Sequence, residues 1–181
     1  MIDAFDLRIL AALQADGRMG NQQLAEVVHL SASQCSRRRA ALEEAGVIRR
    51  YRAELDGERL GLGVTALIQV TLATHSPNTS QEFKALVDRV AAIQEAFAVT
   101  GDADYVLKVV VPDLKSLSGL VSDVLLAHGS IAHLRSSVVL DTLKSGGGLP
   151  LRASLETGGG RNEASTSRMQ GGAAQSMPTH R

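Results

Sequence analysis

Basic and polar side chains gather in one short stretch of the sequence, between positions 30 and 52. Six arginines face only Glu43 and Glu44 there, although the whole chain has a formal net charge of zero. Charges act over about 8 Å in physiological salt, so this local surplus, rather than the neutral total, sets the attraction to phosphate. The stretch is therefore a candidate surface for nucleic acid. A solvated arginine-rich helix is the alternative that the charges alone leave open.

The spacing of these side chains indicates how they would meet a duplex. A helix from Asn21, a turn at Leu30 and Ser31, and a helix ending near Ala45 form a helix-turn-helix pattern. The DNA major groove admits one helix, whose first turns can reach base edges or phosphates. A basic strand over residues 49–52 would contact the flanking backbone as a wing. The predicted DNA-binding residues are Ser31, Ser33, Gln34, Ser36, Arg37, Arg38, Arg49 and Arg50.

Residues suited to catalysis or metal binding do not form a recognisable constellation. The five histidines are scattered, and the single cysteine, Cys35, lies in the predicted recognition helix, where a redox sensor is the less favoured reading. Asp102 and Asp104 are close in sequence but occupy a predicted turn. An enzyme needs a nucleophile, an acid–base pair or a metal cluster in one concave site. We therefore predict no enzyme activity, no catalytic residue, no metal and no cofactor.

Six short motifs, spread in unbroken order over residues 2–144, resemble the Lrp/AsnC (leucine-responsive, feast/famine) family of transcriptional regulators. Each is weak alone, but the set is specific. The motifs are Ile2–Leu10, Asp16–Arg18, Leu30–Ser33, Leu42–Ile48, Val99–Tyr105 and Ser136–Leu140.

The resemblance implies a winged DNA-binding domain and an effector domain that dimerises and often stacks into octamers. It also implies that an amino acid or related metabolite binds between dimers, near the Gly-Asp-x-Asp-Tyr loop and the last strand. Carried over residue by residue, the effector-binding candidates are Gly101, Asp104, Tyr105 and Ser136. Leu134 stands where the family usually has Thr or Ser, and His128-Gly129-Ser130 replaces a common Pro-Gly. The effector is then less polar than usual, or absent.

The N-terminal elements are predicted from caps and apolar spacing. Asp3 is a plausible N-cap for a helix through Leu13, and Gly17 fits a left-handed cap after it. Ser31 can cap the third helix, which would bury Cys35 and end at Gly46. Residues 1–52 are thus a winged helix-turn-helix domain, joined by residues 53–63 as a connecting strand and linker.

Residues 64–144 alternate strand and helix patterns. Strands are predicted at 64–72, 95–100, 105–111 and 131–142, with a tight turn over 101–104. One helix would follow a capping box of Thr79 and Glu82, and another would be capped by Asp113. The order β-α-β-β-α-β is ferredoxin-like, which makes the chain an α+β protein. Because the first strand is apolar on both faces, we expect sheet-to-sheet dimerisation.

The remaining segment, residues 145–181, contains eight of the 17 glycines and is predicted to be a disordered Gly-rich tail. No run approaches the roughly 18 apolar residues of a membrane helix, and the acidic start does not favour export. We therefore expect a cytoplasmic protein with no membrane partner.

Together these features predict a sequence-specific transcriptional regulator that binds double-stranded DNA at a pseudo-palindromic operator. It would act as a homodimer or a higher oligomer such as an octamer, and would respond to a small-molecule effector, an amino acid or related metabolite. The alternative is a metabolite-binding assembly protein that no longer regulates DNA, against which the intact arginine run argues.

Overall fold

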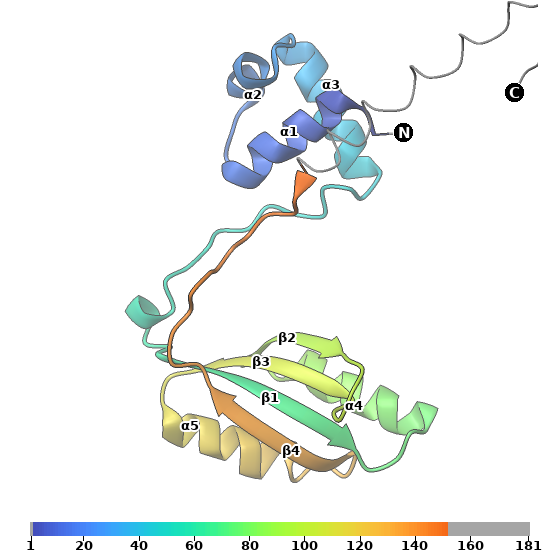
Figure 1. Cartoon of the computed structure of the whole chain (residues 1–181), viewed down its shortest axis with the longest axis vertical. Coiled ribbons are helices and arrows are strands. Elements are labelled where there is room, and N and C mark those ends of the chain that lie inside the picture. Colours follow the sequence, from blue (N-terminus) through green and yellow to red (C-terminus); the bar gives the residue numbers. More distant parts are fainter. Residues whose placement is uncertain (1, 152–181) are drawn as a thin grey trace, which may run out of the picture. The chain divides into compact units, whose positions relative to one another are not determined.

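The computed structural model describes residues 2–151 of the chain. The described residues divide into two compact units, one formed by residues 2–52 with residues 146–151 and the other by residues 53–145. The first contains helices only, and the second combines a sheet with helices (Figure 1). The α+β class predicted from the sequence is confirmed.

The first unit is a three-helix helix-turn-helix. It consists of α1 (Ala4–Ala15), α2 (Asn21–Val28) and α3 (Ala32–Glu44). Asp3 caps α1 and Ser31 caps α3, as predicted, and each cap is part of a reciprocal capping box. The helices enclose a small core, whose buried residues are Ile9, Ala12, Leu13, Leu24, Val28, Cys35 and Leu42.

Two local predictions in this unit are wrong. Gly17 does not adopt a left-handed conformation. Helix α1 ends at Ala15 with Asp16 as an extended C-cap, and the left-handed residues that follow helices here are His29 after α2, with φ of 58°, and Gly46 after α3, with φ of 68°. Residues 49–52, predicted as a strand, form no strand. A strand requires a hydrogen-bonded partner, and the described chain offers none to this segment.

The second unit is a four-stranded antiparallel sheet in the order β2-β3-β1-β4. The strands are β1 (Val64–Leu72), β2 (Ile93–Ala98), β3 (Tyr105–Val111) and β4 (Ile131–Val138). Helix α4 (Pro77–Arg89) connects β1 to β2. Helix α5 (Leu114–Gly119) continues into a π-helical turn, η2 (Leu120–Leu125), before β4. The predicted ferredoxin-like order of elements is confirmed.

The helices cover one face of this sheet, as Figure 1 shows, and the main core lies between them. Ile68 and Val70 of β1 are fully buried on that face, next to Leu107 of β3. On the opposite face of β1, Leu67 is 42% exposed and Phe97 of β2 is 52% exposed. Within residues 2–151, the sheet therefore has one packed face and one uncovered face.

Three predicted boundaries in the second unit change. Helix α4 begins at Pro77 with Ser76 as its N-cap, so the capping box predicted from Thr79 and Glu82 is wrong. Proline is favoured in the first helical turn, and Ser76 supplies the cap that Thr79 was expected to give. Strand β2 begins at Ile93, and β4 ends at Val138 rather than near position 142.

Two further points concern the chain as a whole. Most of the tail predicted to be disordered, residues 152–181, lies outside the described residues. Within the described part, every helix falls short of the length and apolarity needed to cross a bilayer.

Candidate nucleic-acid interface and ligand loop

The three consecutive arginines of α3 have three different environments. The guanidinium of Arg38 donates from Nη1 to Asp3 Oδ2 and to Asp6 Oδ1, each at 2.7 Å. These two carboxylates belong to the N-cap and first turn of α1, so the contact joins the start of α1 to the middle of α3. The hydrogen bonds to Asp6 and Asp3 raise the pKa of the Arg38 guanidinium. Arg38 therefore carries a fixed charge that its own domain already neutralises.

Arg39 points to the other side and holds the chain that leaves α3. Its guanidinium donates to the Met19 carbonyl at 3.1 Å and to Glu43 Oε1 at 3.1 Å. It also lies 4.7 Å from the centre of the Tyr51 ring, and the Tyr51 hydroxyl donates to the same Glu43 oxygen at 2.9 Å. The hydrogen bond from Tyr51, followed by that from Arg39, lowers the pKa of Glu43. This cluster fixes Tyr51 against the helix-turn-helix.

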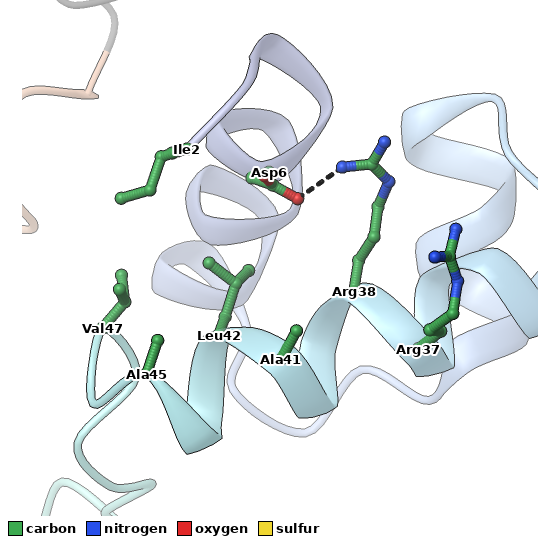
Figure 2. A pocket seen from close by; sticks show the side chains of 8 residues that line it. All are labelled: Ile2, Asp6, Arg37, Arg38, Ala41, Leu42, Ala45 and Val47. Carbon is green, nitrogen blue, oxygen red and sulfur yellow. Dashed lines mark hydrogen bonds and ion pairs between the residues drawn. The ribbon is translucent and has the colours of Figure 1, made fainter.

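Arg37 is exposed and, within residues 2–151, makes no hydrogen bond or ion pair. Figure 2 shows its side chain projecting from α3 beside that of Arg38, whose bond to Asp6 is drawn as a dashed line. Both arginines line one end of a groove of about 410 Å³ between the start of α1 and α3. The rest of the groove is mainly apolar and is lined by Ile2, Ala41, Leu42, Ala45 and Val47.

The polar residues at the start of α3 form a local network. Ser31 Oγ accepts from the Gln34 backbone N–H at 3.2 Å and lies 3.1 Å from Ser33 Oγ, while Gln34 Oε1 accepts from the Ser31 backbone N–H at 3.1 Å. The amide nitrogen of the Gln34 side chain donates to no group among residues 2–151. All three residues are exposed, so capping and outward presentation coincide.

The other predicted DNA-binding residues are exposed too, but on different parts of the unit. Ser36 lies on α3, and Arg49 and Arg50 lie in the irregular segment that follows it. The structure therefore brings the residues from Ser31 to Arg38 together on one helix and leaves Arg49 and Arg50 near the Tyr51 cluster. DNA contact by each of these residues stays a prediction.

Sequence reasoning missed the acidic partners of this surface. Asp6 was not singled out, and Asp3 was identified only as a cap, because their partner Arg38 lies more than 30 positions away. The hydrogen bond from the Asp6 backbone N–H lowers the pKa of Asp3, and the hydrogen bond from Arg38 lowers it further. The signal available in the sequence was the Asp-x-x-Asp pair at the first turn of α1, whose two carboxylates share one side of the helix start.

The predicted ligand loop joins β2 to β3 and is fastened to β1. The Asp104 backbone N–H donates to the Val70 carbonyl at 2.9 Å, and Asp104 Oδ2 accepts from the Leu72 N–H at 2.8 Å. The second carboxylate oxygen, Oδ1, lies 3.7 Å from Nδ1 of His75, whose side chain is 75% exposed. Gly101 has φ of 115°, which favours glycine, and a β-carbon there would meet nothing within 4 Å.

The other two effector candidates lie on the sheet itself. The Tyr105 ring packs against Phe83 of α4, with ring centres 4.6 Å apart. In the sheet register, Val70 of β1 is paired with Tyr105 of β3 on one side and with Leu134 of β4 on the other. Ser136, two residues after Leu134 on β4, is paired with Ile68. The structure thus brings Gly101, Asp104 and Tyr105 together and leaves Ser136 two strands away, roughly 10 Å at ordinary strand spacing.

Metal and nucleophile chemistry finds little support among the described residues. They include no group of three or more His, Cys, Asp or Glu side chains that could hold an ion. His128 Nδ1 lies 2.7 Å from Ser130 Oγ, but Ser130 is 2% exposed and closes the turn into β4. Burial raises the pKa of the Cys35 thiol, which keeps that group protonated.

Comparison with known proteins assigns both units. Residues 2–43 match the AsnC-type helix-turn-helix domain, and residues 65–149 match the Lrp/AsnC ligand binding domain. The chain is thus a DNA-binding protein that carries its own ligand-binding domain. Since curated relatives match at more than 30% identity over most of its length, it belongs to the Lrp/AsnC family of transcriptional regulators.

Two curated relatives and two solved structures illustrate the match. The leucine-responsive regulatory protein of Rhizobium meliloti is 38% identical over 143 residues, 79% of this chain and 92% of the relative. The transcriptional regulator AzlB of Bacillus subtilis is 32% identical over 151 residues, which are 83% of this chain and 96% of the relative. A Neisseria meningitidis transcriptional regulator, solved as an L-Met complex, is similar with a TM-score of 0.82 and 37% identity, over 85% of this chain and 99% of that chain. An AsnC family transcriptional regulator from Agrobacterium tumefaciens is similar with a TM-score of 0.78 and 32% identity, over 83% of this chain and 98% of that chain.

Proposed function

We propose that this regulator binds a pseudo-palindromic DNA operator as a homodimer, with α3 of each copy in the major groove. The observation that carries this proposal is the exposed Arg37, which projects one turn after the capped start of α3 and has no partner in the described chain. Gln34 and Ser33 lie on the same helix end, where side chains reach base edges. We expect Arg49 and Arg50, which precede the anchored Tyr51, to contact phosphates.

The uncovered face of the sheet supports dimerisation. Leu67 and Phe97 are exposed there, and the face also carries the ion pair of Lys108 with Glu95, at 3.1 Å. A second copy placed on this face would bury the apolar side chains, together with the charged pair, whose Lys108 is the register partner of Leu67 and is matched by Glu95. A two-fold axis through such a dimer would present two α3 helices to the two halves of an operator.

The ligand is an amino acid or a closely related metabolite. The similar Neisseria meningitidis regulator was solved with L-Met. In this chain, Asp104 Oδ1 offers a carboxylate oxygen to an α-ammonium group, and the glycine at 101 permits close approach to the loop backbone. Leu134, half-buried beside this region, favours an apolar side chain on the ligand. We expect regulation of assembly or DNA affinity, and no turnover of the ligand.

The DNA proposal is tested with matched arginine variants of the full chain. On a duplex that the wild-type protein selects from a random-sequence pool, Arg37→Ala should cost about 1–3 kcal/mol of binding free energy and relax base preference, because it removes a base contact. Arg50→Ala should lower the salt slope by about one without changing preference, because it removes a phosphate contact. Fluorescence anisotropy against salt concentration measures both.

Arg89→Ala is the control, because Arg89 is an exposed arginine in the last turn of α4, in the other unit. Its binding curve should overlay that of the wild type. Arg37→Ala with unchanged affinity across all operator variants contradicts base reading by Arg37, and a wild-type chain that selects no duplex contradicts the function itself.

A further inference from the structure

Resting on the proposed DNA-binding function, we propose that Arg38 is a positioning residue. It holds the recognition helix α3 on the start of α1 and does not itself contact DNA. Of the three arginines in the run, Arg37 would then be the one that reads the duplex.

The position of Arg38 supports this division of tasks. Its side chain is 26% exposed, and that of Asp6, its more buried partner, is 12% exposed. The guanidinium carbon also lies 5.6 Å from the centre of the Phe5 ring, so α1 contacts Arg38 through two carboxylates and an aromatic face. A side chain with this many partners on α1 would have to break two charged hydrogen bonds to reach a phosphate.

The local charge points the same way. Asp3 and Asp6 together carry one more negative charge than the guanidinium between them can balance. Arg38 therefore offers no unbalanced positive charge to a phosphate, whereas Arg37, Arg49 and Arg50 form no ion pair among the described residues.

The same two carboxylates also start α1. Asp3 Oδ1 accepts from the Phe5 and Asp6 backbone N–H groups at 2.9 Å, and Asp6 Oδ2 accepts from the Asp3 N–H at 3.0 Å. The cap of α1 and the anchor of α3 are therefore one network. Arg38 follows Gln34 by four residues, which is about one helical turn, so the network fixes the orientation of the turn that carries Ser33, Gln34 and Arg37.

The test is a double-mutant cycle between Arg38 and Asp6, measured in the full chain. The variants are Arg38→Met, Asp6→Asn and the double variant, and the probes are the selected duplex and a scrambled duplex of equal length. Asparagine can still accept the Asp3 N–H, so Asp6→Asn removes the charge and keeps the cap. If Arg38 positions the helix, each single variant should weaken binding to the selected duplex about tenfold, and the double variant no more than either.

Two readouts separate positioning from simple loss of folded protein. The ratio of selected to scrambled affinity should fall while the salt slope stays at the wild-type value, and Arg38→Lys should restore part of the ratio. An unfolded fraction would lower both affinities equally, and circular dichroism at the assay temperature measures it directly. Glu44→Gln, which removes an exposed acidic charge from the same helix, should leave the ratio unchanged.

A direct contact between Arg38 and DNA predicts different results in the same experiment. If Arg38 contacts the duplex, Arg38→Met should reduce the salt slope by about one, and Asp6→Asn should leave binding unchanged or strengthen it by releasing the guanidinium. That result overturns the positioning role and leaves the regulator function intact. Failure of the wild-type chain to bind any duplex overturns the function instead.

Discussion

Neighbouring residues of identical type can serve different purposes, and the arginine run of α3 is an example. Arg38 neutralises carboxylates of α1, and Arg39 binds a carbonyl, Glu43 and the Tyr51 ring. Arg37 is exposed and lines the groove beside Arg38. The side chains of consecutive helical residues leave the helix about 100° apart, so three in a row start in three different directions. Side-chain direction, rather than composition, assigns their roles.

The Asp3 carboxylate makes the first unit sensitive to acid. Its pKa is lowered by the Asp6 N–H and then by Arg38, so it stabilises the fold fully above its unfolded pKa of about 3.9. That contribution is lost as the pH falls through the lower, folded pKa. The melting temperature of the wild type should exceed that of Asp3→Asn by a constant amount from pH 7 to pH 5, and by a shrinking amount below pH 4.

Calorimetric or circular-dichroism melts of the two proteins across this range measure the difference. Asparagine is also a good N-cap, so the comparison isolates the charge from the cap. A gap that stays constant down to pH 3 would mean that Asp3 gains nothing from its charge in the native state.

Local signals at the residue scale were predictable, and distant partners were not. Asp3 and Ser31 were correctly identified as caps because a cap depends on the three residues that follow it. The cap predicted at Thr79 is wrong: Thr79 and Glu82 match the capping-box pattern, but the helix starts at Pro77 and Ser76 caps it. The Asp-x-x-Asp pair of α1 is visible in the sequence, but its partner Arg38 is not, because only packing brings α1 and α3 together.

At the scale of elements, β1 is the central feature of the second unit. It pairs with β3 on one side and β4 on the other, and its alternation places Ile68 and Val70 in the core and Leu67 on the uncovered face. Because a strand's side chains alternate strictly, the sequence predicted both faces correctly. The strand predicted at 49–52 does not form, because neither alternation nor basic character supplies the partner strand that it would need.

The uncovered face gives a sharp test of dimerisation. Leu67→Glu should leave the chain folded, because Leu67 is already 42% exposed, but should convert the dimer to monomers by burying an unpaired charge at the interface. Sedimentation equilibrium measures the mass. Leu114→Glu is the matched control, since Leu114 is 62% exposed at the first position of α5, where an acidic side chain is tolerated.

Wild-type and Leu114→Glu proteins should therefore share one mass, and Leu67→Glu should show half of it. A dimer that survives Leu67→Glu would place the interface elsewhere, and a monomeric wild type would remove the dimer from the proposal.

At the scale of the whole molecule, the chain joins a DNA-binding unit to a ligand-binding unit, each with its own core. The order of elements and the family motifs predicted both units from the sequence. The fastening of Asp104 to β1 could not be predicted, because its partners Val70 and Leu72 lie more than 30 positions earlier and are reached only through the sheet register.

Ligand binding should appear as stabilisation of the whole chain. A panel of amino acids that includes L-methionine should contain one that adds about 2.7 kcal/mol at 100 times its dissociation constant. Asp104→Asn should abolish that gain and keep the fold, because the amide oxygen still accepts the Leu72 N–H while the charge that pairs with an ammonium group is gone. Thermal unfolding measured with and without each amino acid gives both values.

Asp123→Asn on η2 is the control for loss of one carboxylate from the same unit and should keep the full gain. If no member of the panel shifts the wild-type melt, the effector is not an amino acid. If Asp104→Asn retains the gain, the ligand binds away from this loop.

The exchange of an amide hydrogen in a strand normally reports on the pairing of that strand, but the amide hydrogen of Leu72 is bonded to a side chain of the loop between β2 and β3. The rate at which this hydrogen exchanges with deuterium therefore depends on how often its hydrogen bond to the Asp104 carboxylate breaks, and not on fraying of the sheet. Nuclear magnetic resonance at this one backbone position would follow the state of the loop in the intact protein, without any label or substitution.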